Sequence, residues 1–320
     1  MTLRVVYMGT PDFAVPALHA LCADPRVEVT LVVSQPDRVA GRGKRVRRTP
    51  VAAAADQHGI PTYQPESLRN EEAFARLSEE KADLFVVAAY GQILLQNVLD
   101  LPTCGCVNLH ASLLPRWRGA APIQWAVAAG DAVSGVSLMR MERGLDTGPV
   151  YATCTAMIRE TETAGELHDR LSQLSGELLI EHLEKLRDPS FEPEVQNADR
   201  SNYARMLTVE DRRVDFTASA QAATWHINGM APWPGARCVI QGETMTLGRA
   251  RLSSLEVPAD AKAGTVLCAD RKQGLHIVAG DQQAVEILEA QRPSKKMISA
   301  KDMLQGYEIA IGIDVEPFAP

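Results

Sequence analysis

The sequence lacks the features that mark membrane, secreted and metal-binding proteins. No run of about 18 apolar residues occurs in its 320 residues, and the first residues contain no apolar stretch that ends in a small-residue cleavage site. We therefore expect a cytoplasmic protein that does not enter a membrane. The six cysteines include no Cys-x-x-Cys pair, so the sequence predicts no metal site, and we expect the cysteines to be buried as small apolar side chains.

Aromatic residues and positive charge are also scarce. Phe, Trp and Tyr make up 5% of the chain, and 33 Lys and Arg are outnumbered by 40 Asp and Glu, which leaves a formal net charge of −7. A surface with this average charge does not favour polyanions such as nucleic acids as partners. Hydrophobic residues nevertheless reach 46%, enough for more than one core at this length, and we expect a two-domain monomer.

The first half of the chain alternates short apolar runs with helical patterns. The runs, bounded by Gly, Pro or polar residues, cover 3–8, 27–34, 84–89, 104–109, 135–141 and 150–158, and the helical patterns cover 13–22, 50–57, 70–81, 120–129 and 164–186. This alternation predicts an α/β domain over 1–188, with a parallel sheet between helices and a ligand site at the carboxyl ends of the strands. The first strand is not followed by Gly-x-Gly-x-x-Gly, so we expect no dinucleotide cofactor.

The second half of the chain has a different pattern. Residues 189–207 carry prolines and mixed polar residues without periodicity, as is typical of a linker. Beyond it, short apolar runs follow one another closely at 237–240, 244–247, 264–269, 274–279 and 284–288, separated by turn residues. We predict a small antiparallel β-barrel of the OB type over 208–314.

Asn108 and His110 form the densest polar cluster, at the end of a predicted strand. Residues two apart in a strand point to the same side, so this amide and this imidazole should converge. The amide suits the stabilisation of an oxyanion, and the imidazole suits proton transfer at neutral pH. The alternative interpretation is a capping Asn beside a hydrogen-bonded structural His.

Asp146 is the candidate carboxylate for this pair. It lies in Gly144-Leu-Asp-Thr-Gly148, after another predicted strand, where the glycines allow a tight loop. A carboxylate there could orient the imidazole or stabilise its charge. The alternative interpretation is an Asx turn, since Asp side chains readily bond the backbone two residues on.

Several motifs occur in an order that resembles a known family. They are Asn-x-His at 108–110, Ser-Leu-Leu-Pro at 112–115, Gly-Leu-Asp-Thr-Gly at 144–148, Met-Gly-Thr-Pro-Asp-Phe-Ala at 8–14, Gln-Pro-Asp-Arg at 35–38, and Pro-Arg-Trp-Arg-Gly-Ala-Ala-Pro-Ile-Gln at 115–124. From about residue 3 to about residue 310, the sequence resembles the 10-formyltetrahydrofolate-dependent formyltransferases, and among them those that act on initiator methionyl-tRNA. The resemblance implies a Rossmann-like domain, a linker and an OB-like barrel that binds tRNA. It also implies a catalytic set of Asn108, His110 and Asp146, a tetrahydrofolate site lined by Ser112, Leu113, Leu114 and Pro115, and no metal.

One basic segment stands out in this acidic chain. Six basic residues and one acidic residue lie between 37 and 48, namely Asp37, Arg38, Arg42, Lys44, Arg45, Arg47 and Arg48. Gly41, Gly43 and the flanking prolines predict a mobile loop at the end of the second strand, where it is either a solvated surface loop or a phosphate contact. The resemblance implies that it contacts the acceptor end of the tRNA through Arg38, Arg42, Lys44 and Arg45, with Arg42 as the key residue.

Two further functions remain open at the level of sequence. The related formyltransferases that act on small amines, such as a glycinamide nucleotide or an amino-sugar nucleotide, share the Asn, His and Asp, and only the basic loop separates them from this chain. A non-catalytic RNA-binding protein is the second alternative, which the intact catalytic set disfavours. In the predicted barrel, Lys295 and Lys296 are the best candidates for phosphate contacts, while Arg205 is the only basic residue in the segment 203–209 at the end of the linker.

Overall fold

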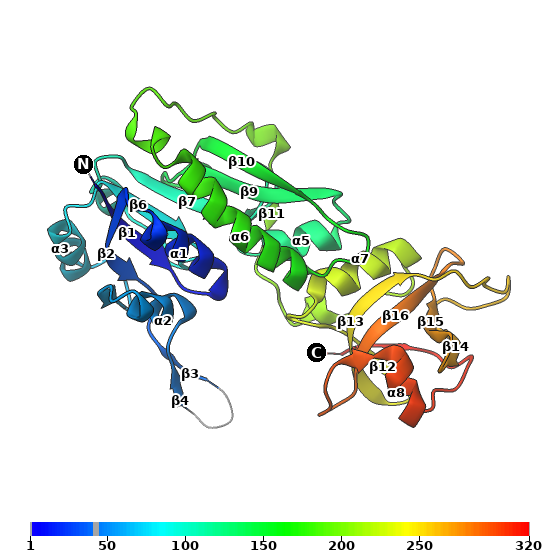
Figure 1. The fold of residues 1–320 in the computed structure, drawn as a ribbon. Coiled ribbons are helices and arrows are strands. Elements are labelled where there is room, and N and C mark those ends of the chain that lie inside the picture. The colour runs from blue at the N-terminus through cyan, green and yellow to red at the C-terminus, as the bar shows by residue number, and fades with distance from the viewer. Residues whose placement is uncertain (1, 41–44, 320) are drawn as a thin grey trace. The chain divides into compact units, whose positions relative to one another are not determined.

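The computed structural model describes residues 2–40 and 45–319, which divide into two units (Figure 1). The first unit comprises Met1–Gly119, Ser134–Ala156 and His168–Tyr203, and the second comprises Ala120–Val133, Met157–Leu167 and Ala204–Pro320. Two segments that the sequence pattern assigns to the first domain therefore cluster with the second unit. The physical reason is local packing, because helix α5 (Pro122–Ala128) lies against helix α7 (Ala220–Met230).

The first unit is built on a seven-stranded sheet in the order β10-β9-β7-β6-β1-β2-β5. Its strands are β1 Leu3–Gly9, β2 Val27–Val33, β5 Thr62–Tyr63, β6 Leu84–Ala88, β7 Cys106–His110, β9 Val133–Arg140 and β10 Val150–Met157. The pairs β2–β5, β1–β2, β1–β6 and β6–β7 are parallel, as expected, but β9 is antiparallel to β7. The prediction of a purely parallel sheet is wrong at this edge, because α5 packs on α7 and does not form the crossover that returns a parallel strand.

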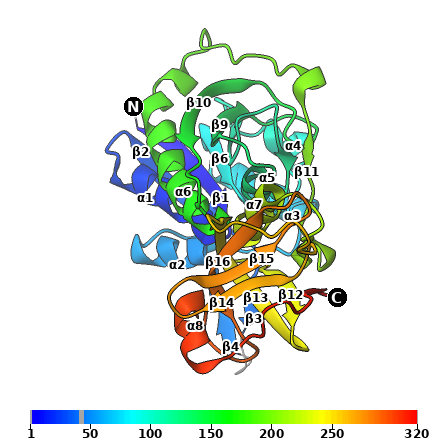
Figure 2. The ribbon, with the colours of Figure 1, turned by 90° about the vertical axis from the view of Figure 1, so that its right-hand side faces the viewer.

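Helices cover both faces of this sheet, with α1 (Val15–Ala23) and α6 (Ala164–His182) on one face and α3 (Glu71–Glu79) and α4 (Gln96–Leu99) on the other (Figures 1 and 2). Alternate strand residues supply the core beneath α3 and α4, such as Met8 and Val87, which pack with Leu77. Helix α2 spans Pro50–Gln57, as predicted, and its N-cap Thr49 accepts a hydrogen bond from the Ala52 amide.

The second unit contains an antiparallel half-barrel. Its strands are β12 Ala236–Ile240, β13 Glu243–Leu252, β14 Val266–Asp270, β15 Gly274–Val278, β16 Ala284–Gln291, β17 Ile298–Ser299 and β18 Glu316–Pro317. They follow the order β14-β15-β16-β13-β12-β18, with β17 paired to β16. The predicted fold class, an α/β domain followed by a small OB-like barrel, is thus confirmed.

Helices α7 and α8 (Ala300–Gly306) of the second unit have no counterpart among the predicted elements. Helix α7 contains Thr224, Asn228 and Gly229, which lower its helix propensity and hide it from sequence analysis. Asn228 is buried because its amide exchanges two hydrogen bonds with the backbone of Ala250, at 3.0 and 2.9 Å. Tertiary contacts with strand β13, rather than local propensity, stabilise this helix.

The cysteines fit the expected role only in part. Cys106, Cys238 and Cys268 are buried, whereas Cys22, Cys104 and Cys154 are half-buried. Burial raises the pKa of the Cys238 thiol to about 12, so this thiol stays protonated at neutral pH.

In the part of the chain that the structure describes, no helix combines the length and the apolar character needed to cross a bilayer.

Candidate active site

The candidate site begins at the carboxyl end of β7, in the middle of the first sheet. Asn108 pairs in register with Val87 of the parallel strand β6, and His110 lies opposite Ser137 of the antiparallel strand β9. The two-residue period of the strand turns the Asn108 and His110 side chains to one face, as predicted. His110 is 6% exposed and Asn108 is half-buried.

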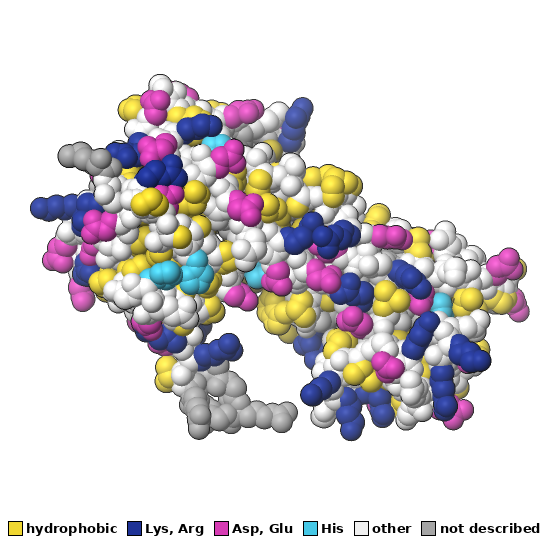
Figure 3. All heavy atoms as spheres, viewed as in Figure 1, with side chains coloured by type: hydrophobic (Ala, Val, Ile, Leu, Met, Phe, Trp, Pro, Cys, Tyr) yellow, Lys and Arg dark blue, Asp and Glu magenta, His cyan; other side chains and the backbone are white. Residues whose placement is uncertain are grey.

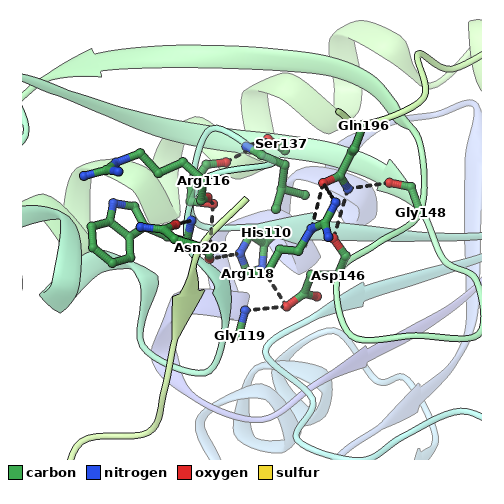
Figure 4. A network of polar contacts seen from close by, with 12 residues as sticks. His110, Arg116, Arg118, Gly119, Ser137, Asp146, Gly148, Gln196 and Asn202 are labelled. Atoms are coloured by element: carbon green, nitrogen blue, oxygen red, sulfur yellow. Dashed lines mark hydrogen bonds and ion pairs between the residues drawn. The ribbon is translucent and has the colours of Figure 1, made fainter. Parts of the chain in front are cut away.

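Hydrogen bonding fixes the tautomer of the His110 ring (Figure 4). Its Nε2 lies 2.9 Å from the backbone carbonyl oxygen of Trp117, which only accepts, so Nε2 carries a proton and donates it. Nδ1 is then the unprotonated nitrogen of the neutral ring. The carboxylate oxygen Oδ2 of Asp146 stands 3.7 Å from Nδ1, so the imidazolium form directs a second N–H toward that carboxylate.

Asp146 lies in the loop between β9 and β10 with its backbone in the left-handed region, at φ 51°. Its Oδ2 accepts a 2.9 Å hydrogen bond from the Gly119 amide, and its side chain is 14% exposed. The loop is closed tightly, since a Cβ atom on Gly148 would lie 1.9 Å from the Arg140 carbonyl oxygen. The predicted meeting of Asp146 with His110 therefore depends on a glycine at 148.

The Asn108 amide is available to a ligand. Among the described residues, none forms a hydrogen bond with its side chain, although the residue is half-buried near the carboxyl end of β7. An amide in this position offers two N–H donors to a polar atom that enters the site. The capping role considered from the sequence is not observed.

The segment at 112–115, predicted to line a folate site, follows His110 directly. Ser112 is fully buried, and its hydroxyl donates to the Arg116 carbonyl oxygen at 2.7 Å. The Ser137 hydroxyl donates to the Ser112 carbonyl oxygen at 2.7 Å and accepts from the Leu114 amide at 3.0 Å. Leu113, Leu114 and Pro115 keep accessible apolar surface. These three side chains are therefore accessible, while the Ser112 hydroxyl shapes the turn.

Sequence reasoning missed two polar residues that support the site, Gln196 and Asn202 (Figure 4). The Gln196 amide donates to the carbonyl oxygens of Asp146 and Gly148, and its oxygen accepts from the Arg118 guanidinium. The Asn202 side-chain oxygen accepts from the backbone amide of Trp117. Gln196 and Asn202 belong to the segment predicted as a linker, where polar residues without periodicity are expected to face solvent. No sequence signal short of a comparison of relatives would have found them.

The basic segment forms a short hairpin instead of the expected irregular loop. Strand β3 (Arg38–Ala40) pairs antiparallel with β4 (Arg45–Arg47), so Arg38 stands directly opposite Arg47. Both side chains are exposed and neither has a carboxylate partner among the described residues. Directly opposed like charges repel unless an anion joins them. Arg42 and Lys44 lie outside the described residues, and for Arg45 the structure describes only the backbone.

A polar network holds the base of this hairpin. Asp37 accepts from the Thr49 amide at 3.1 Å and from the Gln64 amide at 2.7 Å. Arg48 binds Asp56 through two hydrogen bonds of 2.6 and 2.7 Å and lies 3.4 Å from Asp37. Arg48 was counted among the basic residues of the loop, but it is a structural residue neutralised by two carboxylates.

Basic side chains also gather on the second unit, on the face that carries α8 (Figure 3). A cavity of about 350 Å³ there is lined by Arg292, Lys295, Lys296, Ile298, Met303 and Tyr307, among others. Arg292 is neutralised by Glu243 at 2.9 Å and lies over the Tyr307 ring at 3.8 Å. Neither Lys295 nor Lys296 has a carboxylate partner in the described part of the chain. Both remain candidates for phosphate contacts.

A second group of cations in this unit also lacks counter-ions. The guanidinium groups of Arg212 and Arg237 lie 5.9 and 5.3 Å from the centre of the Phe318 ring. Burial and the charge of Arg237 lower the pKa of Arg212, and Nε of Arg237 is buried without a hydrogen-bond partner. No carboxylate pairs with either guanidinium within the described residues.

No three His, Cys, Asp or Glu side chains in residues 2–40 and 45–319 are arranged to hold an ion.

The chain is similar to proteins of known activity along its whole length. Residues 3–183 match the family described as "Formyl transferase", and residues 206–308 match "Formyl transferase, C-terminal domain". The chain is 43% identical over 309 residues to Methionyl-tRNA formyltransferase of Magnetococcus marinus, covering 97% of both chains. It is 44% identical over 312 residues to that of Paracoccus denitrificans, covering 98% of this chain and 100% of the relative.

Solved structures with the same fold include two that were determined with folates. HypX from Aquifex aeolicus in complex with tetrahydrofolic acid aligns with a TM-score of 0.62 and 17% identity, covering 100% of this chain and 51% of that chain. The N-formyltransferase from Helicobacter canadensis in complex with folinic acid and dTDP-3-aminofucose aligns with a TM-score of 0.65 and 15% identity, covering 91% of this chain and 100% of that chain. At these identities the similarity shows a common fold.

Proposed function

This chain belongs to the family of methionyl-tRNA formyltransferases, and from this premise we propose that it transfers the formyl group of 10-formyltetrahydrofolate to the α-amino group of initiator methionyl-tRNA. The observation that carries the proposal is the approach of Asp146 Oδ2 to within 3.7 Å of His110 Nδ1 at the end of strand β7, the strand that also carries Asn108. The products are N-formylmethionyl-tRNA and tetrahydrofolate. No metal takes part in this proposal.

The three side chains suit the two halves of a formyl transfer. The amine attacks the formyl carbon, a new C–N bond forms, and the carbonyl oxygen becomes an oxyanion that the Asn108 amide stabilises. When the bond from the formyl carbon to N10 breaks, the attacking nitrogen must lose a proton and N10 must gain one. His110 serves this transfer through Nδ1, since Nε2 is held by the Trp117 carbonyl. Asp146 stabilises the imidazolium that exists between the two steps.

Two kinds of accessible side chain in the first unit suit the two substrates. The half-buried side chains of Leu113, Leu114 and Pro115 form apolar surface beside His110 for the folate. The exposed pair Arg38 and Arg47, with Arg42, Lys44 and Arg45 of the same basic sequence segment, supplies positive charge for the acceptor end of the tRNA. In the second unit, Lys295 and Lys296 are available for phosphates further along the RNA.

The acceptor assay tests this function directly. The protein is incubated with 10-formyltetrahydrofolate and, in separate reactions, initiator methionyl-tRNA, a glycinamide nucleotide and an amino-sugar nucleotide, and the formylated product is measured by mass spectrometry. We expect formylation of methionyl-tRNA alone. Formylation of a small amine instead would assign the chain to the other branch of the superfamily. Binding of the RNA without any formylation would identify a non-catalytic RNA-binding protein.

Arg42→Leu tests the role of the basic hairpin. We expect KM for initiator methionyl-tRNA to rise about tenfold, the usual cost of one lost charged contact to a nucleic acid, and the preference over elongator methionyl-tRNA to fall. The slope of log KM against log salt should also decrease by about one, the change expected when one phosphate contact is lost. Arg69→Leu, a change at an exposed arginine of the same unit, is the matched control. An unchanged KM and slope for Arg42→Leu would remove this residue from the RNA interface.

A further inference from the structure

We propose that Gln196 is a positioning residue for the reaction, which acts by holding the Asp146 loop and the Trp117 turn in the geometry that the His110–Asp146 pair requires. The inference rests on the proposed function, because it concerns the rate of formyl transfer. Gln196 does not contact the imidazole itself. Its effect passes through the backbone of the two segments that orient the imidazole and the carboxylate (Figure 4).

The Gln196 amide uses its full hydrogen-bonding capacity. Nε2 donates to the carbonyl oxygens of Asp146 and Gly148 at 2.9 and 2.6 Å. Oε1 accepts from Nε and Nη2 of Arg118 at 3.0 and 2.8 Å. The orientation of the amide is unambiguous, because a guanidinium only donates and a carbonyl only accepts. A side-chain amide is needed here, because its NH₂ group supplies two donors for the Asp146 and Gly148 carbonyls and its oxygen accepts from Arg118.

These bonds join the two loops on which the catalytic pair depends. Asp146 has a left-handed backbone at φ 51°, a conformation that is unfavourable for a residue other than glycine, and the Gln196 bond fixes its carbonyl group. Arg118 directly follows Trp117, whose carbonyl oxygen holds Nε2 of His110. Gln196 therefore connects the residue that carries the carboxylate with the turn that orients the imidazole.

The position of Gln196 is itself secured by tertiary contacts. Two residues earlier, Glu194 forms an isolated β-bridge with Val150 at the start of β10, through two backbone hydrogen bonds of 2.8 Å. On the other side, Arg118 donates its backbone amide to the Asn202 carbonyl oxygen at 3.1 Å, and Asn202 accepts from Trp117. The segment predicted as a linker thus contacts both loops of the site through Gln196 and Asn202.

Three variants test the proposal. Gln196→Ala removes all four bonds, Gln196→Met keeps the length without polar atoms, and Gln196→Glu keeps the acceptor for Arg118 but cannot donate to the two carbonyls. We expect each to lower kcat by about 10- to 100-fold, the effect of a misplacement of about 1 Å, and to change KM for either substrate by less than about threefold. Wild-type kcat in Gln196→Glu would show that the Asp146 and Gly148 bonds do not matter, and would overturn the proposal.

Gln241→Ala is the control for the loss of hydrogen bonds from a side chain to the backbone. Gln241 also spans two backbone groups, the Glu308 carbonyl at 3.1 Å and the Ala310 amide at 2.9 Å, but it belongs to the second unit. Its side chain is exposed, and its replacement should remove these two hydrogen bonds without changing kcat. If Gln196→Ala lowers kcat only in proportion to its loss of folded protein, the residue has a structural role and the proposal fails.

A double-mutant cycle with Asp146→Asn supplies the deciding readout. If Gln196 acts through Asp146, then Gln196→Ala should lower kcat by less than about threefold in the Asp146→Asn background, although it has a large effect in the wild type. Additive losses would show that Gln196 does not act through this carboxylate. Failure of the proposed function is a separate result, because the wild-type protein would then formylate no methionyl-tRNA at all.

Discussion

Replacing His110 with alanine is expected to lower kcat by about 10²- to 10⁴-fold, the usual contribution of one general acid–base group. The ring is 6% exposed, donates through Nε2 to the Trp117 carbonyl and faces Asp146 through Nδ1. No other imidazole is available in the Asn108–His110–Asp146 cluster to carry the proton from the amine to N10. Single-turnover kinetics with saturating 10-formyltetrahydrofolate and methionyl-tRNA would measure the loss in the chemical step itself.

Two further variants separate proton transfer from packing. His110→Gln retains an N–H donor for the Trp117 carbonyl but cannot take up a proton at neutral pH, so its kcat should be as low as that of His110→Ala. His276→Ala removes a buried histidine of the second unit that is hydrogen-bonded to Ser253 and Gln273. It should destabilise the fold and leave kcat of the folded protein unchanged. Near wild-type turnover by His110→Gln would exclude acid–base catalysis by this residue.

Replacing Asn108 with alanine is expected to lower kcat by about 10²- to 10³-fold, the typical loss when one oxyanion donor is removed. The side-chain amide is half-buried near the carboxyl end of β7 and has no hydrogen-bond partner among the described residues, so the native fold should lose little stability. Tetrahydrofolate affinity, measured by titration calorimetry, should remain within about threefold of the wild-type value, because the oxyanion exists only during the reaction.

The isosteric change Asn108→Asp makes the test specific. A carboxylate of the same size accepts but does not donate and repels a developing negative charge, so its kcat should fall at least as far as that of Asn108→Ala. Asn70→Ala is the matched control, since Asn70 only caps helix α3 by accepting from the Ala73 amide. It should lower stability by about 1 kcal/mol without affecting kcat. Equal turnover in Asn108→Asp and the wild type would contradict an oxyanion role.

Much of the first unit was predictable because its signals are local. Buried strands such as β1, β2 and β6 are continuous apolar runs, and helix α2 begins at a Thr-Pro pair that caps it. The resemblance inferred from the motifs is confirmed by similarity over nearly the full length to curated relatives. In contrast, α7 was missed because Thr224, Asn228 and Gly229 weaken its local signal, and the antiparallel direction of β9 depends on where α5 packs.

By itself, the sequence predicted which residue types could carry the chemistry and that Asn108 and His110 share a face, since a strand alternates its side chains with a period of two. Only the tertiary structure decided how these groups are held. Asp146 reaches His110 and the Gly119 amide from a separate loop, and Gln196 and Asn202 reach the same site across 50 and 85 residues of chain. No local period encodes such a contact. A polar side chain finds its partners only after the strands and loops that carry them have come together, which is why a segment predicted as a linker supports the site.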